Sequence, residues 1–230
     1  MEADKERLRV KLVALQERIE RACRKAGRPR DAVRLVVVTK THPAETIQEL
    51  IDLGIKDIGE NRVQEIEEKF VRRFKGDFSL HMVGHLQTNK VGQVLPYVKW
   101  IQSIDREKLV SRIEFCRTGA SKLKALVEVN TSGEASKSGC TPQECRALCE
   151  RVCRSSALEF CGLMTVGPLS GGEREVRESF SVLRRLGETC RELAPGLELS
   201  MGMSGDFEWA IEEGSTMIRV GTVLLGKRQW

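Results

Sequence analysis

The stretch Arg34-Leu-Val-Val-Val-Thr-Lys40 (RLVVVTK, residues 34–40) decides the architecture of this chain. Its apolar run is short, rich in β-branched residues and bounded by charges, which is typical of a strand buried on both faces. Strands of that kind occur in parallel sheets, where helices cover both sides. Before it, apolar residues at three- and four-residue spacing predict an amphipathic helix over residues 4–26.

After this first strand, strand and helix patterns alternate along the whole chain. Seven further strands are predicted at residues 57–60, 79–83, 100–104, 124–130, 158–164, 197–200 and 216–220. Helices are predicted between them at residues 43–53, 61–74, 105–116, from 141 onward, 173–193 and 206–213. The alternation implies a parallel sheet with crossover connections. Eight strands in a chain of this length favour an α/β fold of the (β/α)8 TIM-barrel type, and an open doubly wound sheet is the alternative.

Length and composition support a single domain over residues 1–230, with residues 1–30 as a leading helix outside the barrel repeat. The chain has 230 residues, 40% hydrophobic and 31% charged, so there is enough apolar material for a core. No apolar run approaches the ~20 residues of a membrane span, and the charged N-terminus lacks the apolar stretch of a secretion signal. We therefore expect a cytoplasmic protein with no membrane partner.

The net charge of +5 comes from basic and acidic residues that are interspersed rather than segregated. Nucleic-acid-binding proteins usually concentrate their basic residues on one face, so no nucleic-acid partner is expected.

The eight cysteines raise the question of a metal site. Cys145, Cys149 and Cys153 recur at every fourth residue and are expected on one face of a helix. Zinc sites usually have cysteines at two-residue gaps together with a second pair, and neither feature occurs here. We interpret these thiols as small apolar side chains in the core and predict no metal site.

In a barrel of this type, functional groups lie at the carboxyl ends of the strands. Lys40 closes the first strand, where partial desolvation would lower its pKa and make its amine nucleophilic; a solvated lysine is the alternative. Ser204-Gly205-Asp206 opens a helix, and Gly221-Thr222 follows the last strand. Such glycine turns offer backbone N–H groups to a phosphate, although ordinary turn chemistry would give the same pattern.

Seven motifs occur in order over most of the chain, from Leu35 to Trp230. They are Val38-Thr39-Lys40-Thr41-His42-Pro43, Ile58-Gly59-Glu60-Asn61-x-Val63-Gln64-Glu65, His81-x-Val83-Gly84-x-Leu86-Gln87-x-Asn89-Lys90, Asn130-x-Ser132-x-Glu134-x-x-Lys137-x-Gly139, Gly162-Leu163-Met164, Leu199-Ser200-Met201-Gly202-Met203-Ser204 and Gly214-Ser215-Thr216-Met217-x-Arg219-x-Gly221. In this combination the chain resembles the pyridoxal phosphate homeostasis proteins, single-domain relatives of the alanine racemase barrel. It departs from that family at Arg62, where tyrosine is usual.

The resemblance implies that pyridoxal 5′-phosphate (PLP) is bound as a Schiff base. The residues it assigns to the cofactor are Lys40, Asn61, Met203, Ser204, Arg219, Gly221 and Thr222. Lys40 matches the Schiff-base lysine, and Arg219 matches the arginine that faces the pyridine nitrogen. Ser204, Gly221 and Thr222 match positions that hold the phosphate, while the other two lie beside the ring and along the same wall. His81 and Met164 are further strand-end candidates, for which core packing is an equal alternative.

The family further implies a carrier and buffer of PLP rather than an enzyme, with PLP-dependent apo-enzymes as partners. Barrels of this type can be monomers, and no apolar stripe in the sequence demands a partner, so we expect a monomer. Two features of the sequence agree with this role. A guanidinium at Arg219 cannot take up the proton of the pyridine nitrogen, which weakens the ring as an electron sink. The only tyrosine, Tyr97, is expected in a loop before the fourth strand, poorly placed as a second acid. A weak amino-acid racemase is the alternative, and a barrel that binds another phosphorylated metabolite is a third.

Overall fold

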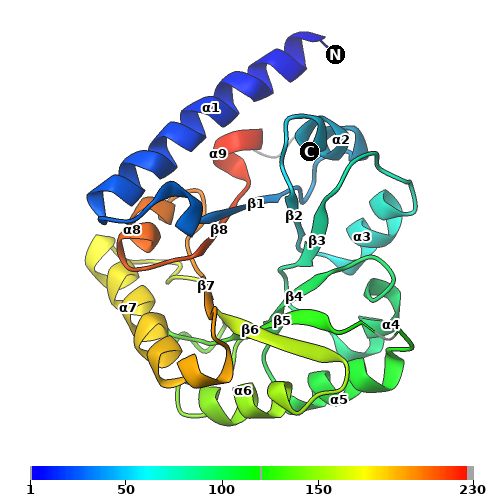
Figure 1. Ribbon diagram of the computed structural model, residues 1–230, viewed down its shortest axis with the longest axis vertical. Helices are drawn as coiled ribbons and strands as arrows, with labels where there is room; N and C mark the ends of the chain where they lie inside the picture. Colours follow the sequence, from blue (N-terminus) through cyan, green and yellow to red (C-terminus); the bar gives the residue numbers. More distant parts are fainter. Residues whose placement is uncertain (1, 120, 227–230) are drawn as a thin grey trace.

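A computed structural model describes residues 2–119 and 121–226. Its eight parallel strands close into a barrel in sequence order, and the first strand pairs with the last. Figure 1 looks into this barrel and shows the helices arranged around it. The strands are β1 (Arg34–Val38), β2 (Asp57–Glu60), β3 (Ser79–Met82), β4 (Trp100–Ile104), β5 (Leu123–Glu128), β6 (Leu158–Met164), β7 (Glu198–Ser200) and β8 (Met217–Val220). The predicted TIM barrel is confirmed, and the open sheet is wrong.

Helices form the outer layer, and all but the first and the last connect successive strands. They are α1 (Glu2–Lys25), α2 (Ala44–Asp52), α3 (Val63–Phe70), α4 (Val91–Val94), α5 (Glu107–Cys116), α6 (Cys145–Cys153), α7 (Glu173–Thr189), α8 (Phe207–Glu212) and α9 (Thr222–Leu225). Three short 3-10 helices add to these: Arg30–Ala32, Thr88–Lys90 and Arg191–Leu193. The strands match their predicted spans to within two residues. The sequence patterns gave no indication of α4, whose four residues are too few to display a helical period.

The predicted helix start at Thr141 shows how a capping pattern can precede its helix. Thr141 Oγ1 accepts a hydrogen bond from the Glu144 amide, and the Glu144 carboxylate accepts one from the Thr141 amide. These are the reciprocal bonds of a capping box. However, they close a turn, and the α-helix begins only at Cys145.

The leading helix α1 lies outside the barrel against α8 and α9, as Figure 1 shows. Its apolar stripe is buried, and Ile19 has no exposed surface. At its edge Arg18 makes two hydrogen bonds to the Glu208 carboxylate, at 3.1 and 2.9 Å. The guanidinium also lies 4.7 Å above the ring of Phe207.

Within residues 2–119 and 121–226, no helix has the length and apolar character that crossing a bilayer requires.

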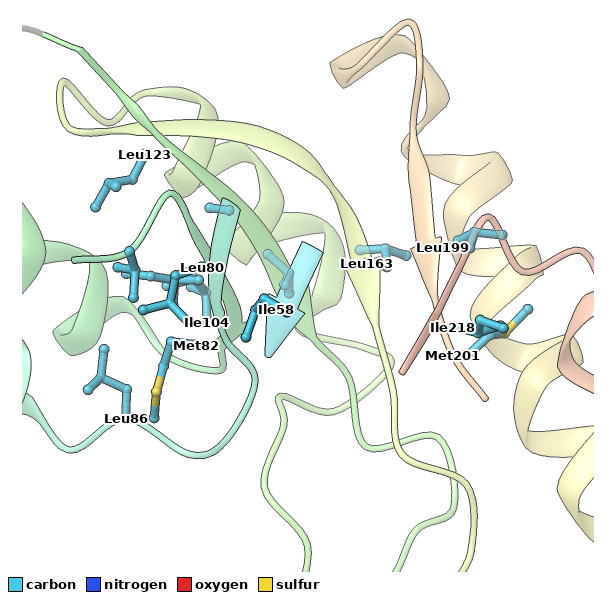
Figure 2. Close-up of a cluster of buried hydrophobic side chains, with 14 of the residues drawn as sticks. Ile58, Leu80, Met82, Leu86, Ile104, Leu123, Leu163, Leu199, Met201 and Ile218 are labelled. Atoms are coloured by element: carbon cyan, nitrogen blue, oxygen red, sulfur yellow. The ribbon is translucent and has the colours of Figure 1, made fainter. Parts of the chain in front are cut away.

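Most of the hydrophobic core fills the space between the strands and the helices. Figure 2 shows part of it, with Ile58, Leu80, Met82 and Ile104 gathered on neighbouring strands. Residues on the opposite faces of the strands point into the barrel, since successive side chains alternate. A smaller apolar cluster lies there, formed by Val36, Trp100, Leu126, Met164 and Met217. This cluster is separate from the main core, and polar side chains such as His81 and Gln102 are buried as well.

Gly162 marks an irregularity in this closed sheet. The pairing of β5 with β6 shifts between Ala125 and Leu126, next to Gly162. Gly162 has φ +151°, and a Cβ atom there would lie 2.0 Å from the Glu198 carbonyl oxygen on β7. Only glycine lets the two strands approach this closely.

The structure corrects the cysteine prediction in part. Cys145 and Cys149 are fully buried, but Cys153 is exposed. Four residues on an α-helix advance about 40° beyond one full turn, so the third thiol in the series rotates away from the core. The thiol that lies beside the first two is that of Cys190, which follows α7.

Candidate functional site

A cavity of about 240 Å³ opens at the carboxyl ends of β1, β2 and β8. All seven residues that the sequence assigned to a cofactor line it: Lys40, Asn61, Met203, Ser204, Arg219, Gly221 and Thr222. The remaining lining comes mainly from the same strand ends and from the turn that precedes α8. The structure thus brings together residues from both ends of the sequence, because β1 and β8 are neighbours in the closed sheet.

Two acidic side chains hold the residues on both sides of Lys40: Glu60 is fully buried, and Glu65 is partly buried. Thr39 Oγ1 donates a 2.7 Å hydrogen bond to Glu60 Oε1 at the end of β2. The Thr41 amide donates a 2.6 Å bond to Glu65 Oε2 on α3. Thr41 has φ +66°, the only positive value among the non-glycine residues that the structure describes. Such a conformation is unfavourable and needs support from its surroundings, which these bonds supply.

Lys69 joins these two carboxylates. Its ammonium lies 2.8 Å from Glu60 Oε1 and 2.7 Å from Glu65 Oε2, and it donates a 2.9 Å bond to the Thr39 carbonyl oxygen. Burial raises the pKa of Glu60, and Lys69 opposes that effect. Lys69 itself is 9% exposed. Sequence reasoning missed this residue, because a lysine four positions after a glutamate is usual on a solvated helix face.

Hydroxyl and amide groups meet on the opposite side of the cavity. Ser204 Oγ lies 3.3 Å from the Gly221 nitrogen and 3.2 Å from the Val223 nitrogen, and it accepts from both. A Cβ atom on Gly221 would lie 3.0 Å from the Val38 carbonyl oxygen, so the turn packs closely on β1. Thr222 adds a second hydroxyl to the lining. Converging N–H and O–H donors of this kind are suited to an anion.

Arg219 is the buried cation of the site. Its Nη1 donates a 2.6 Å bond to Ser200 Oγ, and its Nη2 donates a 2.7 Å bond to the Thr165 carbonyl oxygen. Burial lowers the pKa of Arg219 to about 10, while the carboxylates of Glu128 and Asp206 oppose that effect. The guanidinium therefore keeps its charge at neutral pH, and two bonds fix its plane against the cavity.

From Arg219 a chain of hydrogen bonds runs through the barrel interior. The Ser200 hydroxyl donates to Gln102 Oε1 at 2.7 Å, and Gln102 Nε2 lies 2.9 Å from His81 Nδ1. Since the amide nitrogen only donates, His81 carries its proton on Nε2, which lies 2.9 Å from Asp57 Oδ1. Burial lowers the pKa of His81, in spite of Asp57, so the ring is neutral.

Two strand-end candidates are absent from the cavity lining, His81 and Met164. His81 stacks on Trp100, with ring centroids 5.2 Å apart, and is fully buried. Met164 belongs to the apolar cluster inside the barrel. For both residues the packing alternative agrees with the structure.

Asn61 and Met203 form parts of the wall. Asn61 packs against Gly84, where an added Cβ would lie 2.1 Å from the Asn61 carbonyl oxygen. Met203 is 37% exposed, and its amide donates to Asp206 Oδ1 at 2.5 Å, which closes the turn before α8. His42 also lines the cavity, and burial lowers the pKa of its imidazole. Tyr97 is absent from the lining and packs on the hydrophobic core.

Glu128, at the end of β5, is a buried acid that the sequence analysis did not single out. Burial raises its pKa to about 7, the Asp105 charge adds to the effect, and Arg219 opposes it. Its Oε2 atom has no hydrogen-bond partner. A glutamate in a β-strand gives no sequence signal for burial, because the face it occupies depends on how the barrel closes.

Comparison with known proteins shows the family to which this chain belongs. The family described as alanine racemase, N-terminal domain, matches residues 10–229. A pyridoxal phosphate homeostasis protein of Aquifex aeolicus is 40% identical over 96% of this chain and 98% of its own length. The human protein of the same name is 38% identical over 95% of this chain and 86% of its own length.

Solved structures give the same picture. The PipY protein of Synechococcus elongatus, in a structure with PLP bound, has 31% sequence identity and a TM-score of 0.74, covering 95% of this chain and 100% of that one. A protein of Bifidobacterium adolescentis, described as unknown, has a TM-score of 0.90 at 35% identity, covering 98% and 97%. The alanine racemase of E. faecalis is 16% identical with a TM-score of 0.72, covering 93% of this chain and 58% of that enzyme, and shares the fold.

Proposed function

This chain belongs to the pyridoxal phosphate homeostasis proteins, within the alanine racemase N-terminal domain family, and on that premise we propose that it binds PLP in the cavity between β1 and β8. The proposal rests above all on one observation: Lys40 lines the same cavity as Ser204 and Gly221, which are hydrogen-bonded to each other. When bound, PLP supplies an aldehyde that condenses reversibly with a lysine amine.

The donor set fits the two ends of this cofactor. Lys40 offers the amine, and the contacts to Glu60 and Glu65 hold the backbone on either side of it. The hydroxyls of Ser204 and Thr222 offer donors for a phosphate, and the Gly221 amide, which now donates to Ser204 Oγ, lies beside them. We infer that Lys40 is the point of covalent attachment and that these three residues hold the phosphate.

We further propose that the protein carries and buffers PLP and does not turn over amino acids. Arg219 supports this role, because a guanidinium donates hydrogen bonds and has no acceptor atom that could take a proton. Facing the pyridine nitrogen, it would leave that nitrogen unprotonated and the ring a weaker electron sink than one paired with an aspartate. Tyr97, the only tyrosine, lies away from the lining.

Covalent attachment is tested by loading the purified protein with PLP, reducing it with borohydride and mapping the modified peptide by mass spectrometry. We expect the label on Lys40 and its loss in Lys40→Ala. Lys56→Ala, an exposed lysine before β2, is the matched control and should label as the wild type does. A Lys40→Ala protein that keeps the same imine absorbance band would contradict the assignment.

The phosphate assignment is tested by comparing PLP with pyridoxal, which lacks the phosphate. Ser204→Ala should weaken PLP binding about 10- to 100-fold, as expected for one hydrogen bond to a charged group, and leave pyridoxal binding unchanged. Equal weakening of both ligands would place the phosphate elsewhere.

The carrier role predicts direct transfer to a PLP-dependent apo-enzyme. The rate of transfer from the loaded protein should rise with apo-enzyme concentration above the rate of spontaneous release. A transfer rate equal to spontaneous release would leave only a buffering role. Measurable deuterium wash-in at Cα of alanine, faster than with free PLP, would favour the racemase alternative.

We also propose that the protein is a cytoplasmic monomer. All eight cysteines are unpaired, as expected in a reducing compartment. Light scattering of the purified protein checks the oligomeric state, and a dimer mass would contradict it.

A further inference from the structure

Four of the eight cysteines gather between α6 and α7, well away from the cofactor cavity. The Sγ atoms of Cys145, Cys149 and Cys190 all lie within 4.8 Å of one another, and all three residues are fully buried. The thiol of Cys140, which is 6% exposed, contacts that of Cys145. The cluster thus contains three mutually close sulfurs and a fourth at its edge.

Three separate segments deliver these thiols. Cys145 and Cys149 are one helical turn apart on α6, on the face that packs toward α7. Cys190 directly follows α7, where Thr189 Oγ1 lies 3.8 Å from its sulfur. Cys140 ends the long loop after β5, where its backbone pairs with Glu128 and Asn130. Figure 1 shows α6 and α7 as neighbours on the outer layer.

From this convergence we propose that the cluster is a structural binding site for a thiophilic divalent ion, Zn²⁺, with Cys145, Cys149 and Cys190 as ligands and Cys140 available as the fourth. Sulfurs bound at about 2.3 Å to a tetrahedral zinc ion are roughly 3.8 Å apart, so the observed spacing needs only a small contraction. Each ligand binds as a thiolate, and its proton is released to solvent. The bound ion would join α6, α7 and the loop after β5.

The chemistry of the cluster favours a metal over apolar packing alone. If these positions only had to fill space between two helices, alanine or leucine would serve as well as cysteine. A soft cation, in contrast, requires several thiols close together, as they are here. The site is independent of PLP, because none of the four cysteines lines the cofactor cavity.

The test loads the metal during folding, since the cluster is closed to solvent in the folded chain. The full chain is produced in medium supplemented with Zn²⁺ or, separately, Co²⁺, purified, treated with a chelator and analysed by elemental mass spectrometry. We expect about one ion per chain and, for Co²⁺, the intense thiolate charge-transfer absorption of a tetrahedral site. Cys149→Ala and Cys190→Ala should lose the ion, while Cys153→Ala, exposed on the same helix as Cys149, should retain it.

The alanine variants also separate metal binding from packing. They keep a small apolar side chain, so a packing role predicts little loss of stability and no metal in the wild type. PLP loading reports the fold, and it should be equal in all the variants. A folded, PLP-binding wild type that carries no Zn²⁺ or Co²⁺ after this growth would overturn the proposal. A mass two hydrogens lower under non-reducing conditions, with no metal, would overturn it in favour of a disulfide.

Discussion

Replacing Glu128 with glutamine is expected to stabilise the fold at neutral and alkaline pH. Burial raises the pKa of this carboxyl from its ordinary 4.5 to about 7, so the folded protein holds its proton more tightly than the unfolded chain does. The stability that this group contributes is therefore fully present at pH values below 4.5 and is lost as the pH rises to about 7. Glutamine stays neutral throughout and avoids that loss.

The size of the effect follows from the two pKa values. The interval between 4.5 and about 7, at about 1.4 kcal/mol per pH unit, corresponds to about 3 kcal/mol. Glu128→Gln should therefore differ little from the wild type near pH 5 and be about 3 kcal/mol more stable above the pKa of Glu128. This net value already includes the opposing attraction between the Glu128 carboxylate and Arg219.

Urea unfolding at a series of pH values from about 5 to about 8 measures the difference directly, with the slope against denaturant as a check on two-state behaviour. Groups common to both proteins cancel in the comparison. Glu159→Gln, on the exposed face of β6, is the matched control and should show a flat difference. A difference for Glu128→Gln that is independent of pH, or a variant less stable than the wild type at pH 8, would refute the reasoning.

Two further substitutions test the contacts that stabilise the site and the closed sheet. Lys69→Met leaves the Glu60 carboxylate buried without its cation, so we expect the free energy of unfolding to fall by about 3–5 kcal/mol and PLP binding to weaken. Chemical denaturation and PLP titration measure the two effects, and the exposed control Lys108→Met should behave as the wild type in both. Gly162→Ala should lower the unfolding free energy by at least about 1 kcal/mol, because its Cβ meets the β7 backbone, whereas Gly196→Ala, with open space around it, should be nearly neutral in the same assay.

The barrel was predictable because its strands have a simple signal. Runs such as that of residues 35–38 are apolar on both faces, and a parallel strand between core and helices produces that pattern. The same reasoning predicted Lys40 and the Gly221 turn as site residues, since functional groups in such barrels lie at the carboxyl ends of the strands. The structure puts all seven predicted residues around one cavity, and their contacts with PLP stay a prediction.

What the sequence did not reveal depends on contacts between distant elements. Lys69 and Glu128 have ordinary neighbours along the chain, and only the closed barrel buries their charges. The same holds for the thiols: spacing grouped Cys153 with Cys145, whereas the packing of α6 on α7 brings in Cys190. Helical period gives the face of one helix, but the partner across an interface comes from the fold.

The pairing of β1 with β8 has a consequence for the order of events during synthesis. Lys40 emerges from the ribosome early, but the turn at residues 221–222 that completes the pocket is translated long afterwards. Under the attachment proposed above, a nascent chain therefore carries the Lys40 amine with no anion cradle beside it. On that proposal, capture of the vitamin waits until the last strand has docked, and a growing polypeptide should compete for the aldehyde no better than any other lysine in the cell.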